Sequence, residues 1–180
     1  MEQRAFAEQI VRKQKNGKVY LMQAGIGILA VLCLVIVALI PALMMFVPIL
    51  IVMIILLAVL LIRRMNIEYE YILTDHLLDV DTIRAKSSRK RLFSVDVKNF
   101  DRLAAVEGEE ELKHLRSKAQ TVYDVASSAR ASGRWFAEFG SGGETGRTLL
   151  IFEPNERMLK ALMLAVSPRK VRKPQNGGEV

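Results

Sequence analysis

The chain contains a run of 44 residues, from Val19 to Ile62, without a single Asp, Glu, Lys or Arg. As one helix, at about 1.5 Å per residue, the run would be roughly 66 Å long, whereas about 20 residues cross a ~30 Å hydrocarbon core. Pro41 and Pro48 lie near its middle, where a tight connection can reverse the chain. The run therefore predicts a transmembrane hairpin over residues 19–62, with spans at 19–40 and 42–62.

Basic residues flank both ends of this run, and the central stretch PALMMFVP carries no charge. The flanking residues are Arg12, Lys13, Lys15, Lys18, Arg63 and Arg64. Because Lys and Arg near helix ends are retained in the cytoplasm, we expect a multi-pass protein of the cell membrane with both termini cytoplasmic. A cleavable signal peptide is the rival interpretation, but its apolar region is only about 7 to 15 residues and a small-residue cleavage site should follow it.

Composition limits the classes of partner. The 118 residues after the hairpin suffice for one domain and are too few for two of ordinary size. Outside residues 1–18 the chain has 21 basic and 17 acidic residues, a net charge of +4 that is modest for a nucleic-acid binder, so we expect no nucleic acid. The lone cysteine, Cys33, lies in the first span, which excludes an intrachain disulfide and a Cys-based metal site.

The two ends of the chain are predicted to lie outside the folded domain. Residues 1–18 form a basic amphipathic segment in which Phe6, Ile10 and Val11 share one side of a helix. Such a helix could lie in the membrane interface, or it could extend the first transmembrane helix. Residues 169–180 are polar and basic, which predicts a disordered tail.

Alternating patterns over residues 66–168 predict a β-rich domain. In NIEYEYIL the apolar residues alternate with Glu68 and Glu70, and in LLDVDTI they alternate with Asp79 and Asp81, so these carboxylates are expected on solvent faces. Further strand candidates are RLFSVDV, FDRLAAV, TVYDVA, RWFAEF and RTLLIFE. The acidic EGEEELKHLRSK is expected to be a loop or one or two helical turns. The pattern predicts about seven strands.

A C-terminal amphipathic helix is predicted over NERMLKALMLAV. Its apolar stripe comprises Met158, Leu159, Leu162, Met163 and Val166. Either Asn155 is its N-cap or Pro154 is its first residue. A stripe of this size needs an open sheet face to cover, so the domain is expected to be α+β, with the helix packed across a bent sheet or the end of a small barrel.

Several motifs carry a resemblance to a known family. The stretches EYEY, LDVD, RKRLFSVDV and FEPNE, together with EQIVRKQKNG, resemble an uncharacterised family of small two-span membrane proteins of Gram-positive bacteria. The order of strands and helix is similar to that of bacterial pleckstrin-homology-like (PH-like) domains. The resemblance implies membrane placement and a PH-like fold, and it transfers no catalytic or ligand-binding residue.

Motifs that imitate reactive sites lack the required context. SGGETGRT, residues 141–148, imitates a phosphate-binding loop, but a strand pattern follows it where a helix is needed. His76 and the nearby aspartates lack the glycine and distal Glu of a calcium loop. Ser87 and Ser88 have no identifiable base or oxyanion partner. We therefore predict a protein that is not an enzyme, with no catalytic, cofactor-binding or metal-binding residues.

One charged cluster remains a candidate site. An eight-residue connection between two predicted strands contains Arg84, Lys86, Arg89, Lys90 and Arg91. These residues could contact lipid headgroups, or they could form a solvated turn that keeps a strand edge soluble. The leading hypothesis is a membrane-anchored, non-enzymatic interaction domain that binds a protein partner or its own copies. The alternative is binding of anionic lipid through the basic loop, and an enzyme acting near the membrane ranks below both.

Overall fold

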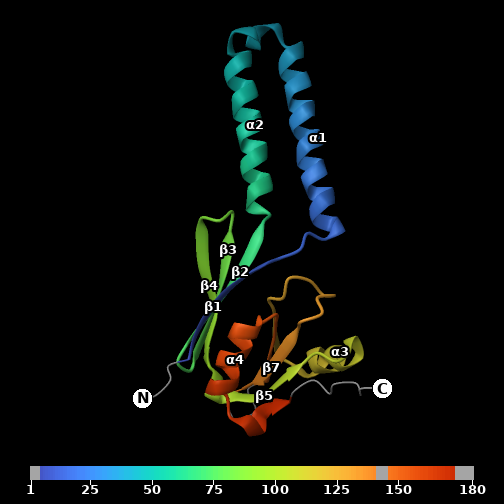
Figure 1. Cartoon of the computed structure of the whole chain (residues 1–180). Helices are drawn as coiled ribbons and strands as arrows, with labels where there is room; N and C mark the ends of the chain where they lie inside the picture. The colour runs from blue at the N-terminus through green and yellow to red at the C-terminus, as the bar shows by residue number, and fades with distance from the viewer. Residues whose placement is uncertain (1–4, 141–145, 173–180) are drawn as a thin grey trace, which may run out of the picture. The chain divides into compact units, whose positions relative to one another are not determined.

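The computed structural model of the chain describes residues 5–140 and 146–172, which fall into two compact units (Figure 1). The hairpin unit comprises Gln14–Ile67 and Ile83–Ser88. The sheet unit comprises Met1–Lys13, Glu68–Thr82 and Arg89–Val180. The chain therefore leaves the sheet unit, forms the helical hairpin, and returns to the sheet unit twice.

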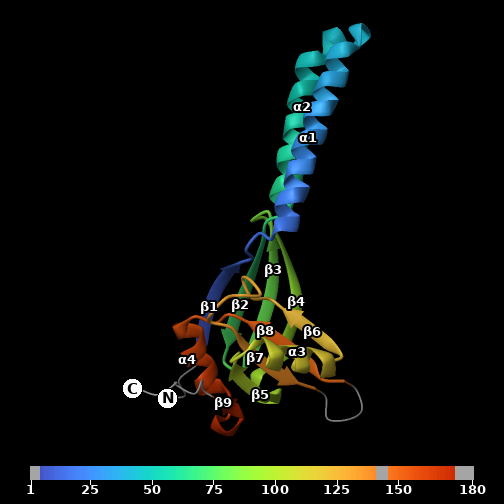
Figure 2. The same ribbon diagram turned by 90° about the vertical axis from the view of Figure 1, so that its right-hand side faces the viewer.

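Two long apolar helices form the hairpin unit, as predicted. Helix α1 (Gly17–Leu39) and helix α2 (Val47–Arg64) are joined by the 3₁₀ helix η1 (Pro41–Phe46), and they run side by side in Figures 1 and 2. Neither helix has a buried residue, and each is long and apolar enough to cross a membrane. Pro41 and Pro48 occupy first-turn positions of their helices, where the missing N–H leaves no intrahelical hydrogen bond unmade.

The first sheet of the protein begins before the hairpin. Its order is β1 (Phe6–Arg12), β2 (Ile67–Thr74), β3 (Leu77–Arg84) and β4 (Ser88–Asp96). Strand β1 pairs antiparallel with β2, from Phe6 opposite Thr74 to Arg12 opposite Glu68. The predicted helix in residues 1–18 is therefore wrong for residues 6–12. Residues 1–4 lie outside the described residues.

The burial of β1 explains this correction. Ala7 and Val11 are 0% and 7% exposed, whereas Phe6 and Ile10 are 53% and 52% exposed. Gln9 is half-buried between the two buried residues, and Glu8 and Arg12 are exposed, so burial alternates with the two-residue period of a strand. This alternation separates Phe6 and Ile10 from Val11, which a helix would place on one side. Pairing with β2, more than 50 residues away along the chain, decides the conformation.

The second sheet has five strands, in the order β6 (Thr121–Asp124), β8 (Thr148–Phe152), β7 (Trp135–Phe139), β5 (Phe100–Ala105) and β9 (Val171–Arg172). The β5–β7 and β7–β8 pairs are antiparallel, and the β6–β8 and β5–β9 pairs are parallel. Strand β9 lies in the predicted disordered tail, so that prediction is wrong for Val171 and Arg172. Residues 173–180 lie outside the described residues.

Two α-helices accompany the sheets. Helix α3 (Glu109–Lys118) is longer than the predicted one or two turns. Its Leu112 and Leu115 are buried in a cluster with Ala104, Phe136, Leu149 and Ile151. Helix α4 (Glu156–Ala165) is the predicted C-terminal helix, and Asn155 caps it by accepting a 2.8 Å hydrogen bond from the Met158 amide. Short 3₁₀ turns, η2 (Val97–Asn99) and η3 (Pro168–Lys170), complete the described elements.

Hydrogen bonds from the first two strands tie the two sheets together. The Gln9 side chain donates to the Glu153 carbonyl at 2.8 Å and accepts from the Asn155 amide at 2.7 Å. The buried Tyr71 hydroxyl donates to the Val125 carbonyl at 2.6 Å. Burial raises the pKa of this phenol, so the hydroxyl keeps its proton and donates it to the Val125 carbonyl. Residues on both sides of the hairpin therefore complete one α+β domain.

Replacing the hairpin by a tight turn should yield a soluble domain. The register places Lys13 next to Ile67, so Asn-Gly between them can continue the ladder as a two-residue hairpin. Residues 5–13, Asn-Gly and 67–172 should unfold cooperatively in urea. Residues 66–168 alone should be less stable by more than about 2 kcal/mol, because the two Gln9 hydrogen bonds contribute about 1 kcal/mol each. Equal midpoints of Trp135 fluorescence for the two proteins would contradict the placement of β1.

Helix α4 offers a matched pair of leucine substitutions. Leu162 is 0% exposed and Leu164 is 69% exposed. In the linked domain, Leu162→Ala should lower the free energy of unfolding by about 2 to 5 kcal/mol because it leaves a cavity. Leu164→Ala should change it by no more than about 0.5 kcal/mol. Similar urea midpoints for the two variants would mean that α4 is not packed as described.

Candidate functional site

The five basic residues of the predicted loop occupy different kinds of position. Arg84 ends β3, Lys86 lies in the turn of residues 85–87, and Arg89, Lys90 and Arg91 belong to β4. The predicted eight-residue connection is therefore wrong, because the strands continue to within three residues of each other. The structure therefore divides the candidate cluster into Arg84 and Lys86, at the turn, and the three residues on β4.

Arg89 and Arg91 are paired with carboxylates on strands β2 and β3 of the same sheet. Arg91 lies 3.0 Å from an Asp79 carboxylate oxygen and 3.3 Å from one of Asp81. The two terminal nitrogens of Arg89 lie 3.0 and 3.1 Å from the two carboxylate oxygens of Glu70. Such two-point pairing is the strong form of an ion pair. These guanidinium groups are therefore neutralised within the sheet.

The carboxylates in these pairs are not on a solvent face, which corrects the sequence-based prediction. Glu70 is 1% exposed and Asp81 is 6% exposed. Burial raises the pKa of Glu70; the Arg89 guanidinium opposes this shift, and the carboxylates of Glu8 and Asp81 add to it. Alternation in the sequence separated these carboxylates from the apolar residues of the strands. It could not show that Arg89 and Arg91 would cover them.

The turn between β3 and β4 is tight. Ala85 and Lys86 have φ angles of 53° and 59°, and the Ser87 amide donates to the Arg84 carbonyl at 3.2 Å. Two consecutive left-handed residues are typical of a type I′ hairpin turn, a conformation that usually selects Asn and Gly. The Ala85 amide donates to the Asn66 carbonyl at 3.3 Å, two residues beyond the end of α2. This hydrogen bond fixes the turn beside the end of the helix.

Charge is segregated between the two units. The hairpin unit contains six basic residues and no Asp or Glu. The six are Lys15, Lys18, Arg63, Arg64, Arg84 and Lys86, and all are exposed. The remaining 20 basic and 19 acidic residues of the chain leave a net charge of only +1. Of the formal charge of +7, +6 therefore belongs to the unit that contains the apolar helices.

The sequence indicates the six cations of the hairpin unit as two separate groups. The helix-flanking residues indicate the membrane topology, and Arg84 and Lys86 belong to the predicted loop. The hydrogen bond between Ala85 and Asn66, which the sequence does not show, joins the two sets. A charge count by itself gives equal weight to Arg89 and Arg84, although the first is paired with Glu70.

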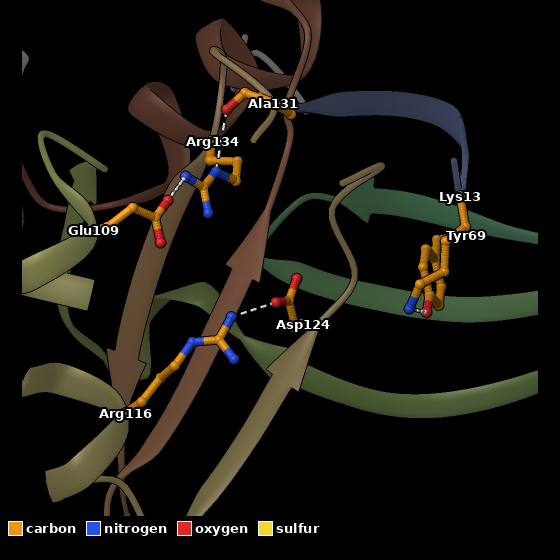
Figure 3. Close-up of polar contacts among 7 residues, drawn as sticks. All are labelled: Lys13, Tyr69, Glu109, Arg116, Asp124, Ala131 and Arg134. Carbon is orange, nitrogen blue, oxygen red and sulfur yellow. Dashed lines mark hydrogen bonds and ion pairs between the residues drawn. The ribbon is translucent and has the colours of Figure 1, made fainter. Parts of the chain in front are cut away.

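Other charged contacts fasten elements of the sheet unit together (Figure 3). The Arg134 side chain, 8% exposed, pairs with Glu109 at the start of α3 and donates to the Ala131 carbonyl at 3.1 Å. The hydrogen bond from Arg134 lowers the pKa of Glu109. Arg116, in the last turn of α3, pairs with Asp124 of β6. Both ends of α3 are thereby tied to neighbouring segments.

The contact between Lys13 and Tyr69 has a similar role. The Lys13 ammonium donates to the Tyr69 hydroxyl at 3.0 Å and lies 5.4 Å from the ring centroid (Figure 3). Lys13 directly follows β1, and Tyr69 lies on β2. The neighbouring Arg12 pairs with Glu68 at 3.0 Å. These contacts fasten the strand ends that lead into the hairpin.

Two of the remaining sequence motifs concern metal binding and phosphate binding. No group of three or more His, Cys, Asp or Glu side chains in residues 5–140 and 146–172 could hold a metal ion. The segment that imitates a phosphate-binding loop falls mainly on residues 141–145, outside the described residues. Strand β8 begins at Thr148, in agreement with the predicted strand.

Comparison with known proteins identifies one relationship. Neither the curated proteins nor the solved structures contain a match to this chain. The family model described as "Bacterial PH-like domain (DUF6106)" matches residues 3–173. The matched region includes β1, the helical hairpin and both sheets. The protein therefore belongs to the DUF6106 family of bacterial PH-like domains, whose function is unknown.

Proposed function

We propose that the protein is a non-enzymatic interaction domain anchored in the cell membrane, which presents its PH-like domain at the cytoplasmic surface to a protein partner or to a second copy of itself. The position of the hairpin, between the paired strands β1 and β2, carries this proposal. An anchor at the end of a domain tethers it by one connection, whereas an insertion between neighbouring strands holds it by two.

The connections between the strands and the helices are short. Residues 13–16 join β1 to α1, and residues 65–66 join α2 to β2. At no more than about 3.6 Å per residue, the five steps from Arg12 to Gly17 span at most about 18 Å. The domain is therefore confined to the surface of the membrane that contains the hairpin, at a high local concentration for a partner at that surface.

The distribution of charge supports a cytoplasmic orientation. Four of the six cations of the hairpin unit lie at the start of α1 and at the end of α2, where the helices connect to β1 and β2. The 3₁₀ helix η1, at the opposite end of the hairpin, has none. Cells retain such cation-rich ends in the cytoplasm. Because β1 and β2 continue from these two ends, both flanking segments lie on the same side of the membrane.

The groups with shifted pKa values have structural partners. Glu70 pairs with Arg89, the Tyr71 hydroxyl binds the Val125 carbonyl, and Glu109 pairs with Arg134. Strong pKa shifts mark candidate catalytic residues when the groups converge in a cleft. Here each group fastens one strand or helix to another, which favours a binding role over catalysis.

Anionic lipid is a second candidate ligand, favoured by one observation. Arg84 and Lys86 belong to the same compact unit as the cations at the helix ends. We therefore restrict the lipid contact proposed for residues 84–91 to these two residues, because Arg89 and Arg91 are paired with carboxylates and Lys90 belongs to the sheet unit.

Cysteine labelling tests the orientation. In a Cys33→Ala background, a cysteine at Met45 in η1 and one at Lys160 on α4 both replace exposed residues. A membrane-impermeant maleimide added to intact cells should label position 45 and should label position 160 only after the cells are opened. Labelling of position 160 in intact cells would overturn the cytoplasmic placement.

Cross-linking tests the interaction role. With a lysine-reactive reagent in native membranes, we expect the full chain to join one recurrent partner, or a second copy, through sheet-unit residues such as Lys90, Lys113 and Lys160. A chain reduced to residues 14–66 should lose these products, because the hairpin then remains without the domain. Cross-links confined to the hairpin, or identical products from the reduced chain, would contradict the proposal.

A further inference from the structure

We infer that the end of the hairpin opposite η1 is a binding surface for anionic phospholipid headgroups. In this surface Arg84 and Lys86 add to the cations supplied by the ends of α1 and α2. The inference rests on the membrane anchoring in the proposed function and extends its second candidate ligand, anionic lipid, to the cations at the helix ends. It also assigns that ligand to residues that are far apart in the sequence.

The helix-end cations define the depth of this surface. Lys15 and Lys18 lie on either side of Gly17, the first residue of α1. Arg63 and Arg64 are the corresponding pair of cations in the last turn of α2. Apolar residues follow on the membrane side of both pairs. Long basic side chains at such positions extend their charged groups to the headgroup layer while their carbon chains stay among apolar groups.

The turn between β3 and β4 adds two cations near this level. The Ala85 amide binds the carbonyl of Asn66, which directly follows Met65 at the end of α2. Arg84 and Lys86 flank Ala85, and both are exposed. The backbone that carries them is therefore hydrogen-bonded to a residue that lies within three positions of Arg63 and Arg64.

These cations lack the internal counterions that neutralise the strand arginines. The hairpin unit has no Asp or Glu, and within the described part of the chain no carboxylate forms an ion pair with its six Lys and Arg residues. Arg89 and Arg91, three to five residues further along, are each paired with a carboxylate. External anions must therefore balance the charge of this surface.

Phospholipid is the anion that fits the position. The cations lie where two helices of membrane-spanning length end, so the nearest abundant anions are phosphate groups in the headgroup layer. Anionic lipids attract each nearby Lys or Arg by an energy equivalent to a factor of about 5 in association. The number and placement of the cations favour lipids with a net negative charge over zwitterionic lipids.

The test uses the full chain in bilayer discs of phosphatidylcholine with a minor fraction of spin-labelled phosphatidylglycerol. The variant R84Q/K86N removes two charges, and Asn tolerates the left-handed conformation of residue 86. Relative to wild type, its association with the labelled anionic lipid should fall by about 30-fold at low salt, that is about 5-fold for each charge. In ~1 M salt, where the screening length is about 3 Å, the difference should disappear.

Two control variants show whether a change in lipid association comes from lost charge, from altered folding, or from charge at any position. R84K/K86R keeps both charges and should bind the labelled lipid as wild type does. K118S/K160S removes two exposed cations of the sheet unit that were never candidates for lipid contact, and it should also bind as wild type does. Wild-type lipid association by R84Q/K86N, or an equal loss in K118S/K160S, would overturn the inference.

The same variants distinguish this inference from the proposed function. If R84Q/K86N loses lipid association but keeps the cross-linked partner, the lipid surface is supported and the interaction role stands. If it keeps both, the lipid inference is wrong and the interaction role is unaffected. If the wild-type chain prefers anionic lipid but gives no cross-linked partner, the interaction role is rejected and the lipid inference stands.

Discussion

The pairing of β1 with β2 is the interaction on which the rest of the structure depends. It joins residues 6–12 to residues 68–74 in seven consecutive partner positions and brings both ends of the hairpin to neighbouring strands. Gln9, on the first of these strands, then binds the backbone at Glu153 and Asn155. The segment before the hairpin therefore links the first sheet to the segment that precedes α4. Closing so long an insertion costs conformational entropy only as the logarithm of its length, so this topology is compatible with a stable domain.

The protein uses its basic residues in two physically different ways. Within the first sheet, Arg89 and Arg91 neutralise carboxylates that would otherwise be buried without a partner, a condition that strongly destabilises a fold. In the hairpin unit, cations without internal counterions gather at one end of the apolar helices. Residues only two or three positions apart, such as Lys86 and Arg89, consequently belong to different electrostatic environments. The strand arginines therefore stabilise the fold, whereas the cations of the turn and of the helix ends remain available to external anions.

Local patterns predicted the elements whose conformation is set by their own residues. The alternation of Tyr69, Tyr71 and Leu73 predicted β2, and all three are buried. The stripe around Leu162 predicted α4, which covers the core with Met158, Ala161, Leu162 and Ala165. The prediction was wrong where a distant segment decides. Residues 6–12 fit a helix or a strand equally well by composition, and the partner strand β2 selects the strand. The predicted eight-residue connection was wrong for a similar reason, because β4 begins at Ser88 and its Arg89 and Arg91 pair with carboxylates on β2 and β3.

The sequence by itself determined the helical hairpin, the β-rich domain and the terminal helix, because long uncharged runs and periodic apolar residues limit the environments that a segment can occupy. Tertiary structure alone decided that the hairpin interrupts the domain, since a strand edge is satisfied only by a partner that the chain brings to it. It also decided which cations remain available. Charge is a property of a residue, whereas neutralisation depends on the distance to an opposite charge, and that distance exists only after folding.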